Sequence, residues 1–180
     1  KKSINFKKIY LFDLDGVILN SKNNMNLAWN SVRKELGIKV KFKEYFTKIG
    51  IPFKDILRKL KIDKKYFKKA EEIFIKSSKK NINKLLLYKN VPETINSLKK
   101  KNKIIGILTS KDKIRTLTIL KKFNLKFDFV LCPVSKKLSK PNPHQIFQII
   151  KKYKAQKKDL VFVGDTGIDK LTSNNAGIDF

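Results

Sequence analysis

The chain has 180 residues, with 43 Lys and Arg against 15 Asp and Glu, which gives a formal net charge of +28 at pH 7. This length suffices for one well-packed domain, or for one domain that carries a small insert. The single Cys132 excludes an internal disulfide and fits a reducing compartment. The apolar run before Asp13 is too short for a signal peptide, and no stretch is long enough for a membrane helix, so we expect a soluble, cytoplasmic protein.

The positive charge is spread along the whole chain and consists almost entirely of lysine. Arginine, which reads phosphate and guanine best, occurs only at Arg33, Arg58 and Arg115. Asn and Ile are also abundant, as an AT-rich coding sequence would produce. We attribute the charge to this bias, so nucleic acid is not expected as a partner, although the field can still attract an anionic substrate.

The expected elements begin with an apolar strand, Ile9–Phe12, and continue with a helical stretch. Apolar residues recur at helical spacing from Met25 to Leu36, and Gly37 marks the end of that helix. No strand is expected from residue 21 to about residue 86. Further helices are expected at Phe42–Ile49, Phe53–Leu60 and Lys64–Lys80.

From Val91 onward, helices and strands alternate. Asn90 is the expected N-cap of a helix whose first turn contains Pro92. Strands that alternate with helices predict a parallel sheet with right-handed crossovers. The expected strands are Lys103–Leu108, Phe127–Leu131 and Leu160–Gly164, and the expected helices are Lys111–Phe123, Pro143–Tyr153 and Thr166–Ala176.

Two acids, Asp13 and Asp15, follow the first strand with one residue between them. Residues i and i+2 of an extended chain point to the same face, so both carboxylates should converge while Leu14 turns into the core. Such a pair is costly unless a cation lies between the acids or one of them holds a proton. A calcium loop is excluded, because Gly16 is preceded by too few oxygen ligands and followed by apolar residues.

Further polar segments follow the other expected strands, and ligands of open parallel sheets bind beyond the carboxyl ends of the strands. Each segment also has an interpretation without a functional role. Thr109 and Ser110, or GDTGID, can simply cap a helix, and Lys140 can be one surface lysine among many. Their occurrence together and in order indicates a common site. The segments are Thr109-Ser110-Lys111, Lys140-Pro141-Asn142-Pro143 and Gly164-Asp165-Thr166-Gly167-Ile168-Asp169.

The motifs DLDGVILNS, LYKNVPETINSLKKKNKIIGILTSK, KPNP and FVGDTGID, with NNAGI after the last, resemble those of the haloacid dehalogenase (HAD) superfamily. The similarity is to the branch that contains phosphoglycolate phosphatases and β-phosphoglucomutases, and it covers nearly the whole chain. It implies an α/β fold with a Rossmann-like parallel sheet core (the HAD fold) and an inserted all-helical cap domain. The core would comprise residues 1–20 and 87–180, and the cap residues 21–86.

The resemblance also implies roles for the acids. Asp13 would be the nucleophile that forms an aspartyl-phosphate, and Asp15 the general acid and base. Mg²⁺ is the implied cofactor, because it binds carboxylates together with water and phosphate oxygens. Its ligands would be Asp13, the backbone carbonyl of Asp15, Asp165 and, through water, Asp169.

The resemblance also implies residues that contact the phosphoryl group and the rest of the substrate. Thr109 and Ser110 would donate hydrogen bonds to the phosphoryl oxygens, and Lys140 would neutralise charge on the transferring group. Gly50 lies in a segment that resembles the cap loop reaching into the site, although a plain connection between helices explains it equally well. Lys54 stands close to the place where related mutases carry an arginine, so Gly50 and Lys54 are candidate substrate-binding residues.

We therefore expect a Mg²⁺-dependent phosphatase, a monomer or homodimer, that acts on a small phosphate ester such as phosphoglycolate, a sugar phosphate or a nucleotide. The first alternative is a β-phosphoglucomutase-like phosphomutase, although Met25 stands where such mutases usually carry a histidine. A phosphonoacetaldehyde hydrolase, which needs a cap lysine, is a further alternative. The last is a non-catalytic basic binding protein on a HAD scaffold.

Overall fold

The computed structural model describes residues 7–135 and 137–180. A parallel sheet with the strand order β5-β4-β1-β6 lies at its centre. The strands are β1 (Ile9–Phe12), β4 (Ile104–Leu108), β5 (Phe129–Leu131) and β6 (Leu160–Val163). β1 is paired on both sides, with Leu11 opposite Gly106 of β4 and Phe162 of β6. The carboxyl end of β1, which Asp13 follows, therefore lies in the middle of the sheet edge.

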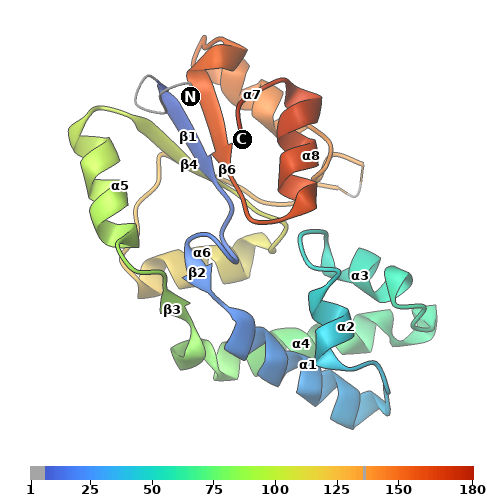
Figure 1. Ribbon diagram of the computed structural model, residues 1–180. Helices are drawn as coiled ribbons and strands as arrows, with labels where there is room; N and C mark the ends of the chain where they lie inside the picture. Colours follow the sequence, from blue (N-terminus) through green and yellow to red (C-terminus); the bar gives the residue numbers. More distant parts are fainter. Residues whose placement is uncertain (1–6, 136) are drawn as a thin grey trace.

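Helices lie on both faces of this sheet, and Figure 1 shows α5 on one side of it and α8 on the other. Because successive side chains of a strand point to opposite faces, Tyr10 and Phe12 pack with apolar residues of α5 and α6, whereas Ile9 and Leu11 pack with residues of α7 and α8. The predicted α/β fold with a parallel sheet is confirmed. We call the sheet and these four helices the sheet unit: α5 (Val91–Lys100), α6 (Lys113–Lys122), α7 (His144–Lys152) and α8 (Gly167–Ala176).

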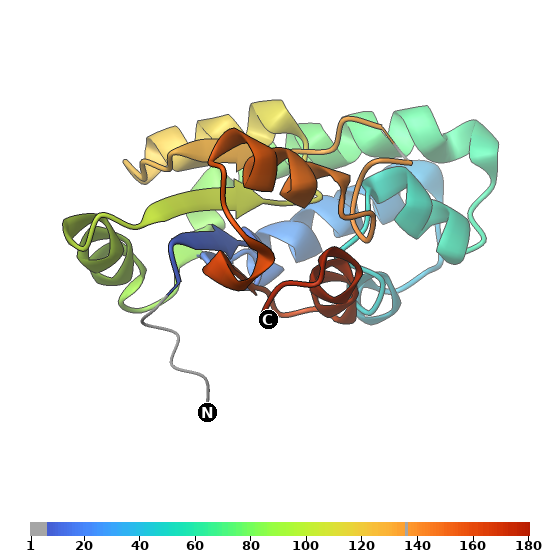
Figure 2. The same ribbon diagram turned by 90° about the horizontal axis from the view of Figure 1, so that it is seen from above.

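The helices between β2 and β3 form a helical unit with an apolar core of its own, beside the sheet unit (Figures 1 and 2). Trp29 is fully buried there, its ring stacks on Tyr45 with 4.5 Å between ring centroids, and its indole N–H donates to the carbonyl of Val40 at 3.0 Å. That residues 21–86 form a cap domain stays a prediction. The helices are α1 (Lys22–Leu36), α2 (Phe42–Phe46), α3 (Phe53–Lys59) and α4 (Phe67–Lys80).

The two connections between these units pair with each other as a small antiparallel sheet of β2 (Leu19–Asn20) and β3 (Leu86–Leu87). Leu19 lies opposite Leu87, and Asn20 opposite Leu86. The sequence did not predict these strands, because two residues are too few to produce an alternating pattern. The pairing joins the points at which the chain leaves and re-enters the sheet unit.

Several predicted helix ends differ from those of the structure. Asn90 is the N-cap residue of α5 as predicted, but it has φ 64° and its side chain makes no capping hydrogen bond. The N-cap of α6 is Asp112, whose carboxylate accepts from the N–H of Arg115, and not Thr109 or Ser110. Because α6 begins only at Lys113, the residues before it remain as a loop at the carboxyl edge of the sheet.

Within residues 7–135 and 137–180, none of the helices has both the length and the apolar character needed to span a membrane.

Candidate active site

The chain turns tightly just after β1. The N–H of Leu19 donates to the carbonyl of Leu14 at 2.8 Å, and the N–H of Gly16 donates to the carbonyl of Leu19, also at 2.8 Å. Gly16 has φ +92°, which residues with a side chain rarely adopt, so the turn requires glycine at this position. Leu14 is fully buried, whereas Asp13 and Asp15 both line one cavity. The two carboxylates therefore face the same space, as the spacing predicts.

Lys140, in the loop before α7, joins two of the acids. Its Nζ lies 3.0 Å from Oδ1 of Asp13 and 2.6 Å from Oδ1 of Asp169, and all three side chains are almost completely buried. Burial lowers the pKa of Lys140, but the charges of Asp13 and Asp169 outweigh it, and the net shift is upward. The ammonium group is thus held charged beside the carboxylate that ends β1.

Three carboxylates gather at this point of the sheet edge. One oxygen each of Asp13, Asp165 and Asp169 lies within 4.8 Å of the others. Burial raises the pKa of Asp13 to about 7 against the charge of Lys140, and the charges of Asp169 and Asp15 add to the rise. Burial, followed by the charge of Asp169, also raises the pKa of Asp165. Mutually repelling carboxylate oxygens are the donor set that suits a hard divalent cation such as Mg²⁺, so the residues fit this ion.

Asp169 also caps α8. Its Oδ2 accepts from the N–H of Thr166 at 3.0 Å and from the Thr166 hydroxyl at 2.6 Å, while the N–H of Asp169 donates to that hydroxyl at 3.2 Å. The interpretation of GDTGID as the start of a helix is therefore correct. The segment also lies near the other acids, because Asp169 is close to Asp13. Because one oxygen contacts Lys140 and the other contacts Thr166, Asp169 positions the lysine, and a direct metal contact would have to share one of these two oxygens.

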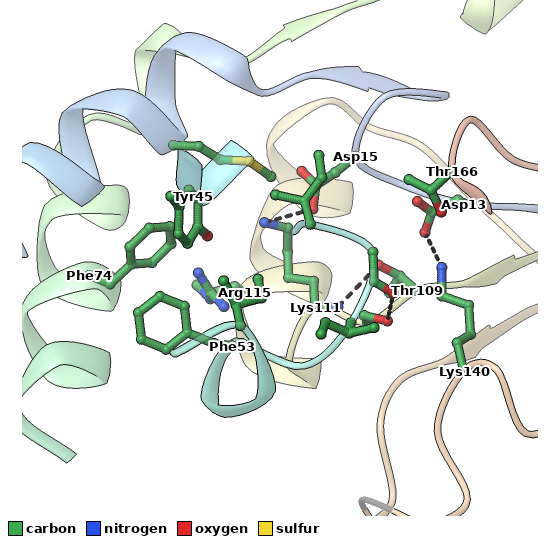
Figure 3. A pocket seen from close by; sticks show the side chains of 16 residues that line it. Asp13, Asp15, Tyr45, Phe53, Phe74, Thr109, Lys111, Arg115, Lys140 and Thr166 are labelled. Atoms are coloured by element: carbon green, nitrogen blue, oxygen red, sulfur yellow. Dashed lines mark hydrogen bonds and ion pairs between the residues drawn. The ribbon is translucent and has the colours of Figure 1, made fainter. Parts of the chain in front are cut away.

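Thr109 and Ser110, after β4, reach different partners. Thr109 is buried and lines the cavity, and its hydroxyl accepts from the N–H of Lys111 at 3.2 Å. In Figure 3 its side chain lies on the side of the cavity nearest Asp13 and Lys140. The hydroxyl of Ser110 instead donates to the carbonyl of Gly50 in the helical unit at 2.8 Å.

Lys111 is a site residue that the sequence analysis did not single out. Its Nζ lies 3.0 Å from Oδ2 of Asp15, and its side chain is only 7% exposed. The other oxygen of Asp15, Oδ1, is buried and has no hydrogen-bond partner within the described part of the chain. Lys111 thus holds one oxygen of Asp15, which lines the cavity, and leaves the other oxygen without a partner (Figure 3). Its only sequence signal is its place directly after Thr109-Ser110, which the abundance of lysine conceals.

The cavity lies between the sheet edge and the helical unit and has a volume of about 60 Å³. Gly50, with φ +98°, approaches the sheet unit so closely that an added Cβ would lie 3.0 Å from Oγ1 of Thr166. The Gly50 loop therefore reaches the site, in agreement with the first of its two interpretations. Among the described residues of the helical unit that line the cavity, Tyr45 carries the one polar side chain, and the apolar ones are Met25, Ile49, Ile51, Phe53, Ile56 and Phe74.

Residues 10–180 match the family described as haloacid dehalogenase-like hydrolase. The chain belongs to this family. Like the fold, this membership agrees with the resemblance of the four motifs.

Named relatives align with most of the chain. A phosphoglycolate phosphatase of Aquifex aeolicus (strain VF5) is 28% identical over 174 residues, which cover 94% of this chain and 81% of the relative. Another, of Pasteurella multocida (strain Pm70), is 29% identical over 185 residues, with 94% and 82% covered. The solved structure of a predicted phosphoglycolate phosphatase from Haemophilus somnus 129PT has a TM-score of 0.85 at 26% identity, covering 98% of this chain and 84% of that one.

Two positions of this haloacid dehalogenase-like chain bear on the expected substrate contacts. The structure does not bring Lys54 into the cavity: its side chain is 52% exposed and its Nζ lies 3.0 Å from Oε2 of Glu71. Met25 does line the cavity, so an apolar thioether occupies the place where a mutase-type relative would carry a histidine.

Arg115 and Tyr45 are cavity residues that the sequence analysis also did not assign. Arg115 lies on α6, and its guanidinium carbon is 5.6 Å from the ring centroid of Phe74 in α4. Burial raises the pKa of Tyr45, while the charge of Arg115 acts in the opposite direction. No local sequence pattern predicts this group, because it forms only where α6 meets the helical unit.

Proposed function

We propose that this chain is a Mg²⁺-dependent phosphatase that hydrolyses a small phosphorylated metabolite through an aspartyl-phosphate on Asp13. One observation carries the proposal. The Asp13 carboxylate lies at the centre of the sheet edge and forms an ion pair with the buried Lys140. It lines the same cavity as Asp15. Phosphoglycolate, sugar phosphates and nucleotides are the candidate substrates, and the relatives named phosphoglycolate phosphatase support the first.

In the first step, an oxygen of Asp13 attacks the phosphorus atom and the ester P–O bond breaks. Asp15 gives its proton to the departing oxygen, so that a neutral hydroxyl leaves. In the second step, Asp15 takes a proton from water, which attacks the aspartyl-phosphate and releases phosphate. The two acids thus carry different roles, and the unpartnered Oδ1 of Asp15 supports proton exchange at that atom.

Two neighbours stabilise the charge on the transferring group. The ammonium of Lys140 neutralises negative charge on the phosphoryl oxygens, and Asp169 keeps it directed toward Asp13. The hydroxyl of Thr109 donates a hydrogen bond to a phosphoryl oxygen. Ser110 contributes differently from the sequence expectation, because its hydroxyl already donates to Gly50.

The Mg²⁺ ion would be held by the carboxylates of Asp13 and Asp165, by the backbone carbonyl of Asp15 and, through water, by Asp169. When bound, the ion would offset the negative charge of the carboxylates and of the phosphate. The clustered oxygens and the raised pKa values of Asp13 and Asp165 support this assignment.

We also propose that residues 21–86 act as a cap that opens for substrate and closes during the first step. The hydrogen bond from Ser110 to Gly50 and the close approach of Gly50 to Thr166 support a closed arrangement. Closure excludes bulk water from the phosphorus atom until the leaving group has been protonated.

Phosphate release from p-nitrophenyl phosphate and from a panel of metabolite phosphates, with Mg²⁺ and with EDTA, tests the proposal. The wild type should require Mg²⁺, and Asp13→Ala and Asp13→Asn should each lower kcat/KM about a thousandfold or more. Asp63→Asn, an exposed acid at the start of a short helical turn, is the control and should retain activity. Equal inactivity of wild type and Asp13 variants across the panel would contradict the proposal.

A further inference from the structure

Arg115 is the only arginine among the described residues that line the cavity, and its side chain is 12% exposed. It extends from the first turns of α6, so it belongs to the sheet unit rather than to the helical unit. Figure 3 shows Arg115 and Tyr45 at the end of the cavity away from Asp13 and Lys140, with Asp15 and Lys111 between the two ends. A group bound at Arg115 would therefore belong to the leaving group and not to the transferring phosphoryl group.

Two contacts hold the Arg115 guanidinium in place. Its Nε pairs with Oδ2 of Asp112, and its guanidinium carbon lies 5.6 Å from the ring centroid of Phe74. Within residues 7–135 and 137–180, neither terminal nitrogen has a hydrogen-bond partner. A planar fork with two free terminal nitrogens is suited to paired hydrogen bonds with a carboxylate or a phosphate.

Among the described residues around Arg115, no acid other than Asp112 pairs with it. The helical unit lines this part of the cavity with apolar side chains and the Tyr45 hydroxyl. Asp15 is paired with Lys111. Asp112, the one ion-pair partner of Arg115 among the described residues, is 40% exposed, so water screens part of its charge. A cation facing an apolar cavity gains most from an anion placed in that cavity.

We propose that Arg115 binds a second anionic group, a carboxylate or a phosphate, on the leaving group of the substrate, and thereby selects phosphate esters that carry such a group. The cavity volume of about 60 Å³ is that of only a few water molecules and favours a short leaving group over a nucleoside. This inference rests on the proposed function, because Asp13 must accept the phosphoryl group at the other end of the cavity.

The test compares kcat/KM for short esters that differ in the charge of the leaving group. Ethylene glycol monophosphate has a neutral leaving group, 2-phosphoglycolate carries a carboxylate, and ethylene glycol bisphosphate carries a second phosphate. The wild type should prefer at least one acidic ester over the neutral one, and the preferred ester identifies the anion. Arg115→Gln should reduce this preference about 10- to 150-fold, mainly through KM, because a hydrogen-bonded charge pair is lost. Arg115→Lys, which keeps the positive charge, should retain part of the preference for the acidic ester.

Arg58→Gln is a closely matched control. Arg58 also pairs with an acid three residues earlier, Asp55, and its guanidinium carbon also lies 5.6 Å from a phenylalanine ring centroid, that of Phe67. It differs in being 47% exposed and outside the cavity, so Arg58→Gln should leave the preference unchanged. A wild type without preference, or an Arg115→Gln variant that keeps it, would overturn the inference while leaving the phosphatase proposal intact.

Failure of the proposed function gives a different result: the wild type then releases phosphate from none of the esters, including p-nitrophenyl phosphate. Ligand-induced shifts of Tm decide the inference in that case. If an acidic ester raises Tm more than the neutral ester does, and Arg115→Gln abolishes the difference, Arg115 binds the second anion. Equal shifts for all the esters in the wild type would overturn the inference.

Discussion

The hydroxyl of Ser110 donates to the carbonyl of Gly50 at 2.8 Å and so joins the edge of the sheet to the loop between α2 and α3. This bond connects residues 60 positions apart in the chain. It lies beside the cavity, where the sheet unit supplies the acids and the helical unit supplies the apolar wall. A change at Ser110 should therefore affect how firmly the two units close.

Ser110→Ala should lower kcat/KM about 2- to 12-fold, because one hydrogen bond of about 0.5–1.5 kcal/mol is lost from the closed form. Steady-state kinetics with p-nitrophenyl phosphate measure the effect. Ser110→Thr keeps the hydroxyl and should behave more like the wild type. Ser97→Ala, on the exposed side of α5, is the control. Unchanged kinetics of Ser110→Ala would show that the bond does not contribute to closure.

Lys111→Met should lower kcat more than it raises KM, since Asp15 loses the cation that holds its carboxylate in place. It should also destabilise the fold by about 1–3 kcal/mol, the cost of leaving a largely buried charged group without its partner. Steady-state kinetics and urea unfolding measure the two effects. Lys111→Arg retains the charge and should recover part of both, and a Lys111→Met variant with wild-type kcat would exclude an orienting role.

Asp165→Asn should raise the Mg²⁺ concentration for half-maximal activity about 10- to 100-fold, because the carboxylate next to Asp13 becomes a weaker neutral donor. A Mg²⁺ titration of phosphate release gives this value. Asp179→Asn, near the end of the chain and away from the acids of the site, is a suitable control. An unchanged Mg²⁺ requirement in Asp165→Asn would argue against metal binding by Asp165.

Asp112→Asn should weaken the dependence of stability on acid pH. Burial raises the pKa of Asp112, but the charge and hydrogen bonds of Arg115 outweigh it and leave the pKa below its usual value. A carboxyl whose pKa is lower in the folded state stabilises the fold above about pH 4 and loses this contribution as the pH falls through the folded pKa. Tm measured between neutral pH and pH 3 should therefore decline less steeply in Asp112→Asn.

The matched comparison for this pH dependence is Glu72→Gln, which replaces an exposed acid on α4. Its Tm should follow that of the wild type throughout the range. If Asp112→Asn follows the wild type as well, the interaction with Arg115 does not differ between the folded and unfolded states.

The sheet unit was largely predictable because its strands are buried runs flanked by polar turns. Ile9–Phe12 is buried at every position, and the structure places β1 there without any shift. The paired strands Leu19–Asn20 and Leu86–Leu87 were not predictable. Their pairing depends on the helical unit bringing its two ends together, which is a property of the whole fold and not of a local pattern.

The acids of the site were predictable for a topological reason. Parallel strands end at one edge, so Asp13 after β1 and Asp165 after β6 had to lie close to each other. Lys111, Arg115 and Tyr45 were not predictable in this way. Their places in the cavity depend on side-chain directions and on contacts between α6 and the helical unit, and lysine is too frequent in this chain for one of them to stand out.

The pairing of β2 with β3 makes residues 21–86 comparable to an exchangeable module, since both junctions lie side by side. Replacing residues 21–86 by the corresponding segment of a relative would exchange the apolar wall of the cavity and the Gly50 loop. Arg115 and Lys111 would be retained, because they belong to the sheet unit. A chimera should therefore inherit the preference of this chain for the charge of the leaving group, while the donor sets the size and shape that the leaving group can have.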